Sequence, residues 1–76
     1  MKNIISKRLK GLMAEHKITV RELSKRLSIS EKSLSLKING RCDWLYEEMI
    51  FVIKQFGFSE VKEVFPELYN FVLEVG

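Results

Sequence analysis

The chain of 76 residues is long enough for one small domain, and its composition, 46% hydrophobic and 30% charged, is that of a globular protein, which excludes disorder and a coiled coil. No stretch is long and apolar enough for a transmembrane helix, and charges interrupt the first residues too often for a signal peptide. Cys42 has only His16 as a possible companion, so we expect no disulfide, no metal site, no cofactor, and a cytoplasmic protein.

Positive charge is concentrated in the first half of the chain, although the net charge is only +3. Residues 1–41 carry eleven Lys or Arg and three Glu, a net charge of +8, whereas residues 42–76 carry two Lys and seven acids, a net charge of −5. A basic half of this kind is typical of a surface that attracts a polyanion such as nucleic acid. The alternative is that these side chains only keep a surface solvated.

An apolar stripe at helical spacing predicts a first helix over about Asn3–His16. The residues of this stripe are Ile5, Leu9, Leu12, Met13 and His16. We interpret His16 as a boundary residue and not as a catalytic base, because no carboxylate or nucleophile is spaced to work with it.

Two helix-start signals of the same kind follow. Thr19 opens a capping box for a helix over Val20–Leu27, and Ser30 caps a helix over Glu31–Asn39 that ends at Gly40. Only three residues separate the two helices, so they cannot lie side by side and must meet at a steep angle. This is the spacing of a helix-turn-helix.

The second of these helices has two unlike faces. On a helical wheel Leu34 and Ile38 share an apolar face that is suited to the core. Almost opposite are one cation and one exposed leucine, flanked by two serines: Lys32, Leu36, Ser33 and Ser35. This small outward face is suited to insertion into a groove.

The pattern L-S-x-R-L-S-I-S-x-K-S-L-S-L-K-I-N-G within this stretch resembles the helix-turn-helix of the phage Cro and CI repressor family, also called the XRE family. The resemblance extends from about Ile4 to Phe65. It implies an all-α, compact five- or six-helix lambda-repressor-like DNA-binding domain over residues 1–65, with the helix-turn-helix formed by the second and third helices.

The resemblance also implies which residues contact DNA. The residues expected to face base edges are Glu31, Lys32, Ser35 and Leu36. The residues expected to contact phosphate are Val20, Arg21, Ser33, Asn39 and Arg41. Each base-facing type has a use in the major groove, such as a lysine donating to guanine or a leucine touching a thymine methyl group. An acid at the first helical position, such as Glu31, can instead simply complement the helix dipole.

Two positions depart from the family pattern. Relatives usually have Gln at the position of Val20, so one side-chain bond to phosphate is missing and only the backbone donor at the helix N-terminus remains. Many relatives have Gly at the position of Ser28, where the turn requires a left-handed backbone that costs a non-Gly residue about 1 kcal/mol.

Two further helices are predicted, over about Tyr46–Phe56, stopped by Gly57, and over Glu60–Phe65, capped by Ser59. The N-cap of the helix over Tyr46–Phe56 is either Leu45 or Asp43. A cap at Asp43 would move the start of this helix by two residues. Its core-like residues are Trp44, Leu45, Met49, Ile50, Ile53 and Phe56. Phe51 and Val52 make the apolar face wider than one core requires. A second copy of the chain or the C-terminal segment of the same chain would cover the excess.

The apolar segment 66–76 fits a helix or a strand, and we favour a helix. Cro-type relatives include proteins whose C-terminal strand pairs across a dimer, so this segment is a possible dimer contact. The resulting hypothesis is a transcriptional regulator, a repressor of the Cro/CI type, that binds a double-stranded DNA operator as a homodimer through the fourth helix, the fifth helix or the tail.

The alternative function is a protein-interaction module of the same fold, such as an antirepressor or antitoxin, that does not read DNA sequence. No Gly-rich phosphate loop, metal-ligand cluster or activated nucleophile is present in the sequence, so an enzyme is not expected.

Overall fold

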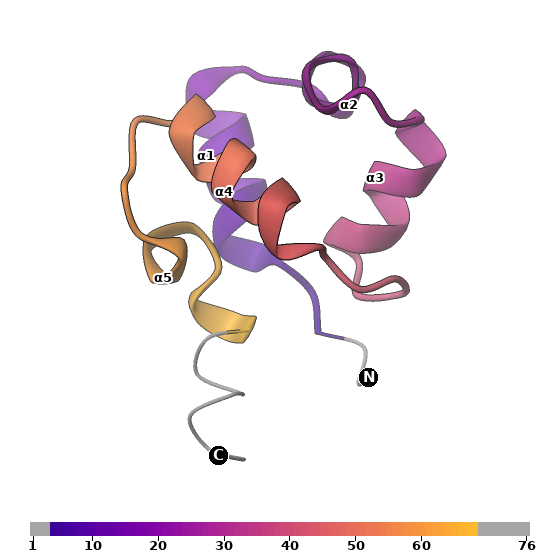
Figure 1. Ribbon diagram of the computed structural model, residues 1–76. Coiled ribbons are helices and arrows are strands. Elements are labelled where there is room, and N and C mark those ends of the chain that lie inside the picture. The colour runs from indigo at the N-terminus through magenta and orange to yellow at the C-terminus, as the bar shows by residue number, and fades with distance from the viewer. Residues whose placement is uncertain (1–3, 69–76) are drawn as a thin grey trace.

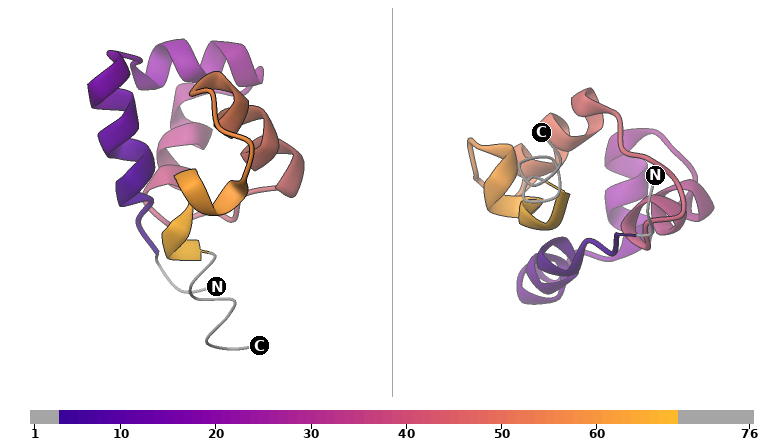
Figure 2. Two further views of the ribbon diagram at one scale, coloured as in Figure 1. Left: turned by 90° about the vertical axis from the view of Figure 1, so that its left-hand side faces the viewer. Right: turned by 90° about the horizontal axis from the view of Figure 1, so that it is seen from below.

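A computed structural model describes residues 4–68, and all the regular secondary structure in this part of the chain is helical (Figure 1). The helices are α1 (Lys7–His16), α2 (Val20–Leu27), α3 (Glu31–Ile38), α4 (Tyr46–Gln55) and α5 (Val61–Val64), and residues 66–68 form a further helical turn. Figure 2 shows α2 lying across one end of the molecule, with both ends of the described chain on the opposite side. The predicted all-α fold is confirmed.

Each helix contributes to one apolar core. The buried apolar side chains are Leu9, Leu12, Met13, Leu23, Leu34, Ile38, Val52, Ile53, Phe56, Val64 and Phe65. The helix α2 packs on α3 and α4, while α1 packs on α3 and α5. Since α4 packs on α5 as well as on α2, the C-terminal part of the described chain is connected to the helix-turn-helix by two routes, through α1 to α3 and through α4 to α2.

The helix-turn-helix begins where the sequence predicts, because its starts are determined by local hydrogen bonds. Thr19 Oγ1 accepts from the Glu22 amide and Ser30 Oγ accepts from the Ser33 amide, each at 3.0 Å. Each bond satisfies an amide that the helix itself leaves free. The Glu22 carboxylate does not complete the capping box and accepts instead from Arg26 Nε at 3.3 Å.

The backbone of the connecting turn also agrees with the sequence. Ser28 is left-handed, with φ of 60°, at the position where a glycine is usual. Gly40 has φ of 76° and follows Asn39, which is the C-cap of α3, so this helix ends one residue earlier than predicted.

The prediction for the start of the first helix is wrong. Asn3 lies outside the described residues, and residues 4–6 are not helical. The amide of Ser6 donates to the carbonyl of Ile38 at 2.9 Å, and this long-range bond keeps the preceding residues out of the helix. Ile5 is consequently 40% exposed and does not join the apolar stripe. His16 is exposed and touches the edge of the Phe56 ring, in keeping with a boundary residue.

The second half departs more often from the predicted pattern. Leu45 is the N-cap of α4, so the alternative cap at Asp43 is wrong. Leu45 is also 59% exposed, whereas Val52, expected on the excess apolar face, is fully buried. The N-cap of α5 is Glu60 and not Ser59. A choice between helix and strand for the tail falls mostly on residues 69–76, which lie outside the described part of the chain.

Candidate nucleic-acid interface

The orientation of α3 agrees with the wheel. Leu34 is fully buried and Ile38 is 3% exposed, so the apolar face is directed into the core. Glu31 and Lys32 are exposed at the start of the helix. Within residues 4–68 neither side chain has a hydrogen-bond or ion-pair partner. The beginning of α3 thus offers one carboxylate and one ammonium group to solvent.

The remaining base-facing candidates are less open. Ser35 and Leu36 are both half-buried, so Leu36 is not the exposed leucine that the wheel suggests. The amides of Arg41 and Cys42 donate to the Leu36 carbonyl at 2.8 and 3.2 Å, and these bonds fold the following loop back beside this residue. Ser33 is half-buried, and its amide is already used by the cap at Ser30.

A small hollow lies where α1, the start of α2 and the end of α3 meet. It has a volume of about 160 Å³ and is lined by Lys10, Met13, Val20, Ser35, Ile38 and Asn39, and we call it the Lys10–Asn39 hollow. The amides of Val20 and Arg21, the first two of α2, have no acceptor in the described part of the chain. Free amides at a helix N-terminus are suited to an anion.

Two polar side chains meet at this hollow. Lys10 Nζ donates to Asn39 Oδ1 at 3.0 Å, and Asn39 Nδ2 donates to the carbonyl of Ser35 at 2.9 Å. Asn39 is therefore held in place, and it holds the ammonium group of Lys10 at the hollow that Val20, the first residue of α2, also lines. Lys10 is not among the residues that the sequence predicts to contact DNA, because no local signal indicates it: the side chain only lies off the apolar stripe, and the packing of α1 on α3 brings it here.

Several cations of the basic half are engaged in holding the fold together. Arg26 contacts Glu22 at 3.3 Å and Gln55 at 3.1 Å, and so connects α2 with α4. Lys37 lies 3.0 Å from Glu48 Oε1, with both side chains only 14% exposed, and it donates to the Asp43 carbonyl at 3.0 Å. These side chains stabilise the domain and are less available to a partner.

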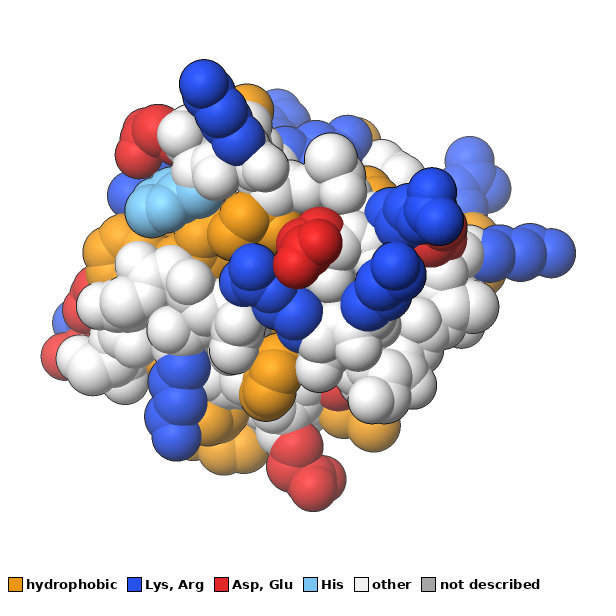
Figure 3. Space-filling model, turned by 90° about the horizontal axis from the view of Figure 1, so that it is seen from above, with side chains coloured by type: hydrophobic (Ala, Val, Ile, Leu, Met, Phe, Trp, Pro, Cys, Tyr) orange, Lys and Arg blue, Asp and Glu red, His pale blue; other side chains and the backbone are white. Residues whose placement is uncertain are grey.

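Other cations of the basic half are exposed and have neither a side-chain hydrogen bond nor an ion pair among residues 4–68. They are Lys7, Lys17, Arg21, Lys25, Lys32 and Arg41. Figure 3 looks onto the end of the molecule that carries α2, and Lys and Arg side chains outnumber acids on this face. The excess positive charge noted in the sequence thus remains on the surface around the helix-turn-helix.

The loop after α3 is fixed from several directions. Gly40 turns the chain, Lys37 holds the Asp43 carbonyl, and the Trp44 ring packs edge-on against Phe65 with ring centres 5.0 Å apart. Arg41 is exposed on this loop. Its backbone is therefore anchored, while its side chain is open to solvent.

A family model of the Cro/C1-type helix-turn-helix DNA-binding domain matches residues 8–45, which is half of the chain. The chain belongs to this family. The match supports a DNA-binding regulator, and the family is one of DNA-binding domains and not of enzymes. No curated protein and no solved structure matches the chain significantly.

The matched range of this Cro/C1-type domain includes all nine residues predicted to contact DNA, and also Lys10. The parts of the chain outside the match are residues 1–7 and residues 46–76, which include all of α4 and α5. Among residues 4–68 there is no helix with the length and apolar character required to cross a membrane. The same residues contain no group of three His, Cys, Asp or Glu side chains arranged to hold a metal ion.

Proposed function

We propose that this Cro/C1-type domain regulates transcription, as a repressor, by binding a specific double-stranded DNA site as a homodimer with α3 in the major groove. The observation that carries the proposal is the arrangement of α3: Leu34 and Ile38 are buried, and the opposite edge begins with two exposed charged side chains that have no partner among residues 4–68. In a helix-turn-helix the second helix enters the groove with its N-terminal residues against base edges.

Four side chains at this edge have distinct uses. Lys32 donates to guanine O6 or N7, and Glu31 accepts from cytosine N4. Ser35 and Leu36 are half-buried, so they contact a base only after Glu31 and Lys32, in the first turn of α3, have bound and brought the helix close to the base edges. In this arrangement Lys32 supplies most of the discrimination, and Leu36 adds contact with a thymine methyl group.

Phosphate contacts on either side hold α3 in register. Lys10 and Val20 both line the Lys10–Asn39 hollow, so the ammonium group of Lys10 and the free amides at the start of α2 are the groups that would bind a phosphate there. Arg41 and Ser33 contact phosphates on the other side of the helix. Such contacts position the protein on the duplex without reading its sequence. The Lys10 side chain supplies the polar group that Val20 lacks.

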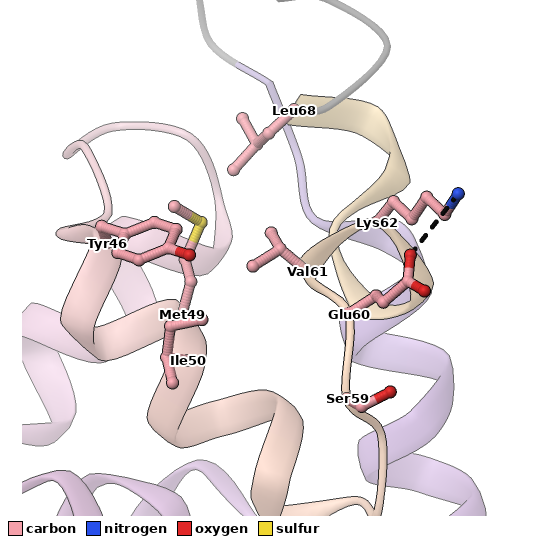
Figure 4. Close-up of a pocket in the computed structure, with 8 residues that line it drawn as sticks. All are labelled: Tyr46, Met49, Ile50, Ser59, Glu60, Val61, Lys62 and Leu68. Carbon is pink, nitrogen blue, oxygen red and sulfur yellow. Dashed lines mark ion pairs between the residues drawn. The ribbon is translucent and has the colours of Figure 1, made fainter.

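The proposed dimer places the two α3 helices in successive major grooves, about 34 Å apart. The surface available for this contact is apolar and lies in the second half of the chain. A groove of about 590 Å³ separates α4 from α5 and the following turn (Figure 4). It is lined by Tyr46, Met49, Ile50, Ser59, Glu60, Val61, Lys62 and Leu68, and we call it the α4–α5 groove. Tyr46 is 67% exposed at its edge and Phe51 on the same helix is 38% exposed.

The proposal is tested by measuring the affinity of the chain for DNA at several salt concentrations by fluorescence anisotropy. A mixed-sequence duplex and a duplex selected from a random pool are compared. We expect binding to both, tighter on the selected duplex. The logarithm of the affinity should fall with the logarithm of salt by about 0.9 per phosphate neutralised. Equal affinity for both duplexes at every salt concentration would contradict sequence-specific reading.

One observation favours a second candidate function, that of a protein-interaction module that does not read DNA sequence. The α4–α5 groove is larger than the Lys10–Asn39 hollow, and all of its lining residues lie outside the family match. The absence of a polar side chain at Val20 points the same way. No DNA binding at low salt, together with a folded protein, would favour this candidate over the first.

A further inference from the structure

The helix α1 has no cap of its own at its N-terminus. Its N-cap residue, Ser6, makes no capping hydrogen bond through its side chain, and the hydroxyl is buried with no partner in the described part of the chain. Instead the amide of Arg8 donates to Glu67 Oε2 at 3.0 Å. The cap of α1 therefore comes from a carboxylate 59 residues further along the chain.

The carboxylate at this place has two effects. It accepts a hydrogen bond from one of the free amides of the first turn, and its negative charge complements the positive end of the helix dipole. Arg8 Nε also donates to the carbonyl of Glu63 at 3.4 Å, so the same turn is bonded twice to the C-terminal segment. The first turn of α1 is thus held from outside the helix.

The same turn also holds the end of α3 that the proposed function places beside DNA. The amide of Ser6 donates to the Ile38 carbonyl, and Lys10 Nζ reaches Asn39. The contacts to Glu67 and to α3 come from Ser6, Arg8 and Lys10, all within five residues of one another. Loosening this turn would release both contacts to α3 and empty the Lys10–Asn39 hollow of its ammonium group.

We infer that Glu67 is a positioning residue for DNA contact: by capping α1 from the C-terminal segment, it keeps Lys10 and the end of α3 in the arrangement that accepts a phosphate. This inference rests on the proposed function. It connects the segment beside the α4–α5 groove with the face that binds DNA, so a change at one is transmitted to the other through α1.

The test compares Glu67→Ala and Glu67→Gln with the wild-type chain and with Glu15→Ala. Glu15 is a matched control because its carboxylate lies on α1 itself, is exposed, and has no hydrogen-bond or ion-pair partner among residues 4–68. Amide hydrogen exchange is measured by NMR without DNA, and affinity for selected and mixed duplexes is measured well below the unfolding temperature.

We expect Glu67→Ala to speed exchange of the Ser6 and Arg8 amides by about tenfold, and to leave the amides of Leu23 and Val52 unchanged, because one turn opens while the core stays closed. Affinity should fall about fivefold on both duplexes, with a salt slope smaller by about one phosphate, as Lys10 withdraws. Glu67→Gln, which keeps an acceptor and loses the charge, should lie between wild type and Glu67→Ala.

Three results would overturn the inference. Exchange that rises equally in all helices would make Glu67 a contributor to global stability only. Unchanged affinity in a wild-type chain that does bind DNA would remove Glu67 from DNA contact and leave the proposed function intact. A wild-type chain that binds no duplex at any salt concentration would overturn both, while the exchange data alone would still report whether Glu67 caps α1.

Discussion

The two ends of α3 differ in how much the rest of the molecule restrains them. At its start, Glu31 and Lys32 are exposed and have no partner within residues 4–68. At its end, Lys37 is bonded to Glu48 and to the Asp43 carbonyl, and Asn39 is bonded to Lys10 and to Ser35. One end is therefore adaptable and the other is fixed.

This difference corresponds to a division of labour in the proposed complex. A side chain that reads a base edge must adjust to find its partner, and it gains from having no competing bond in the free protein. Groups that contact phosphate determine register, and they gain from being held beforehand, because less conformational entropy is lost on binding. Substitutions at the two ends of α3 should therefore have different consequences for stability and for specificity.

Breaking the fixed end should have the largest effect. Glu48→Ala removes the ion pair with Lys37 and the acceptor for the Leu45 amide, which is 2.9 Å from Glu48 Oε1. We expect a loss of about 2–3 kcal/mol in the free energy of unfolding, measured with urea, because it leaves a mostly buried cation unpaired and uncaps α4.

The matched control for this change is Glu47→Ala, in the same turn of α4. The Glu47 side chain is exposed, so its removal should change stability by less than about 0.5 kcal/mol. Similar losses for the two variants would show that the Lys37–Glu48 contact is not what fixes the end of α3.

Changing the adaptable end should alter specificity more than stability. Lys32→Ala should weaken binding to a selected duplex by roughly tenfold, because one donor to a base edge is lost, and should weaken binding to a mixed duplex much less. Anisotropy titrations of both duplexes measure this difference. An equal loss on both would make Lys32 a phosphate contact, and the start of α3 would then have no role in reading.

The fixed end should show the opposite behaviour. Lys10→Ala should weaken binding by about fourfold on selected and mixed duplexes alike and reduce the salt slope by about one, as expected for the loss of one phosphate contact. Lys54→Ala, which removes an exposed cation from α4, should change neither quantity. A loss confined to the selected duplex would contradict the phosphate role of Lys10.

The smallest effect concerns the turn that leads into α3. Ser28 has φ of 60°, a conformation that a glycine adopts without strain. Ser28→Gly should raise the unfolding free energy by about 0.5 kcal/mol, since relief of strain exceeds the extra entropy of the unfolded chain. Ser59→Gly, at an exposed serine without positive φ, should lower it slightly. Destabilisation by Ser28→Gly would show that the serine side chain is required in the turn.

The sequence by itself determined the helix-turn-helix. The starts of α2 and α3, the left-handed Ser28 and Gly40, and the burial of Leu34 and Ile38 all depend on hydrogen bonds and periodicity within about four residues. Such interactions can be read from neighbouring positions, and the family match covers this part of the chain.

Only the tertiary structure decided what surrounds that motif. The start of α1 depends on Ile38 and Glu67, far away in the sequence, and no local pattern reveals a bond of that kind. Val52 on α4 is buried and Leu45, the N-cap of this helix, is exposed, which is the reverse of what the sequence predicts. The apolar run is wider than one helical face, so the packing of α4 on α2 and α5 selects which side chains are buried. The contacts that fix the end of α3 have the same origin: the packing of α1 on α3 brings Lys10 to Asn39, and the loop after α3 brings Glu48, in the first turn of α4, to Lys37.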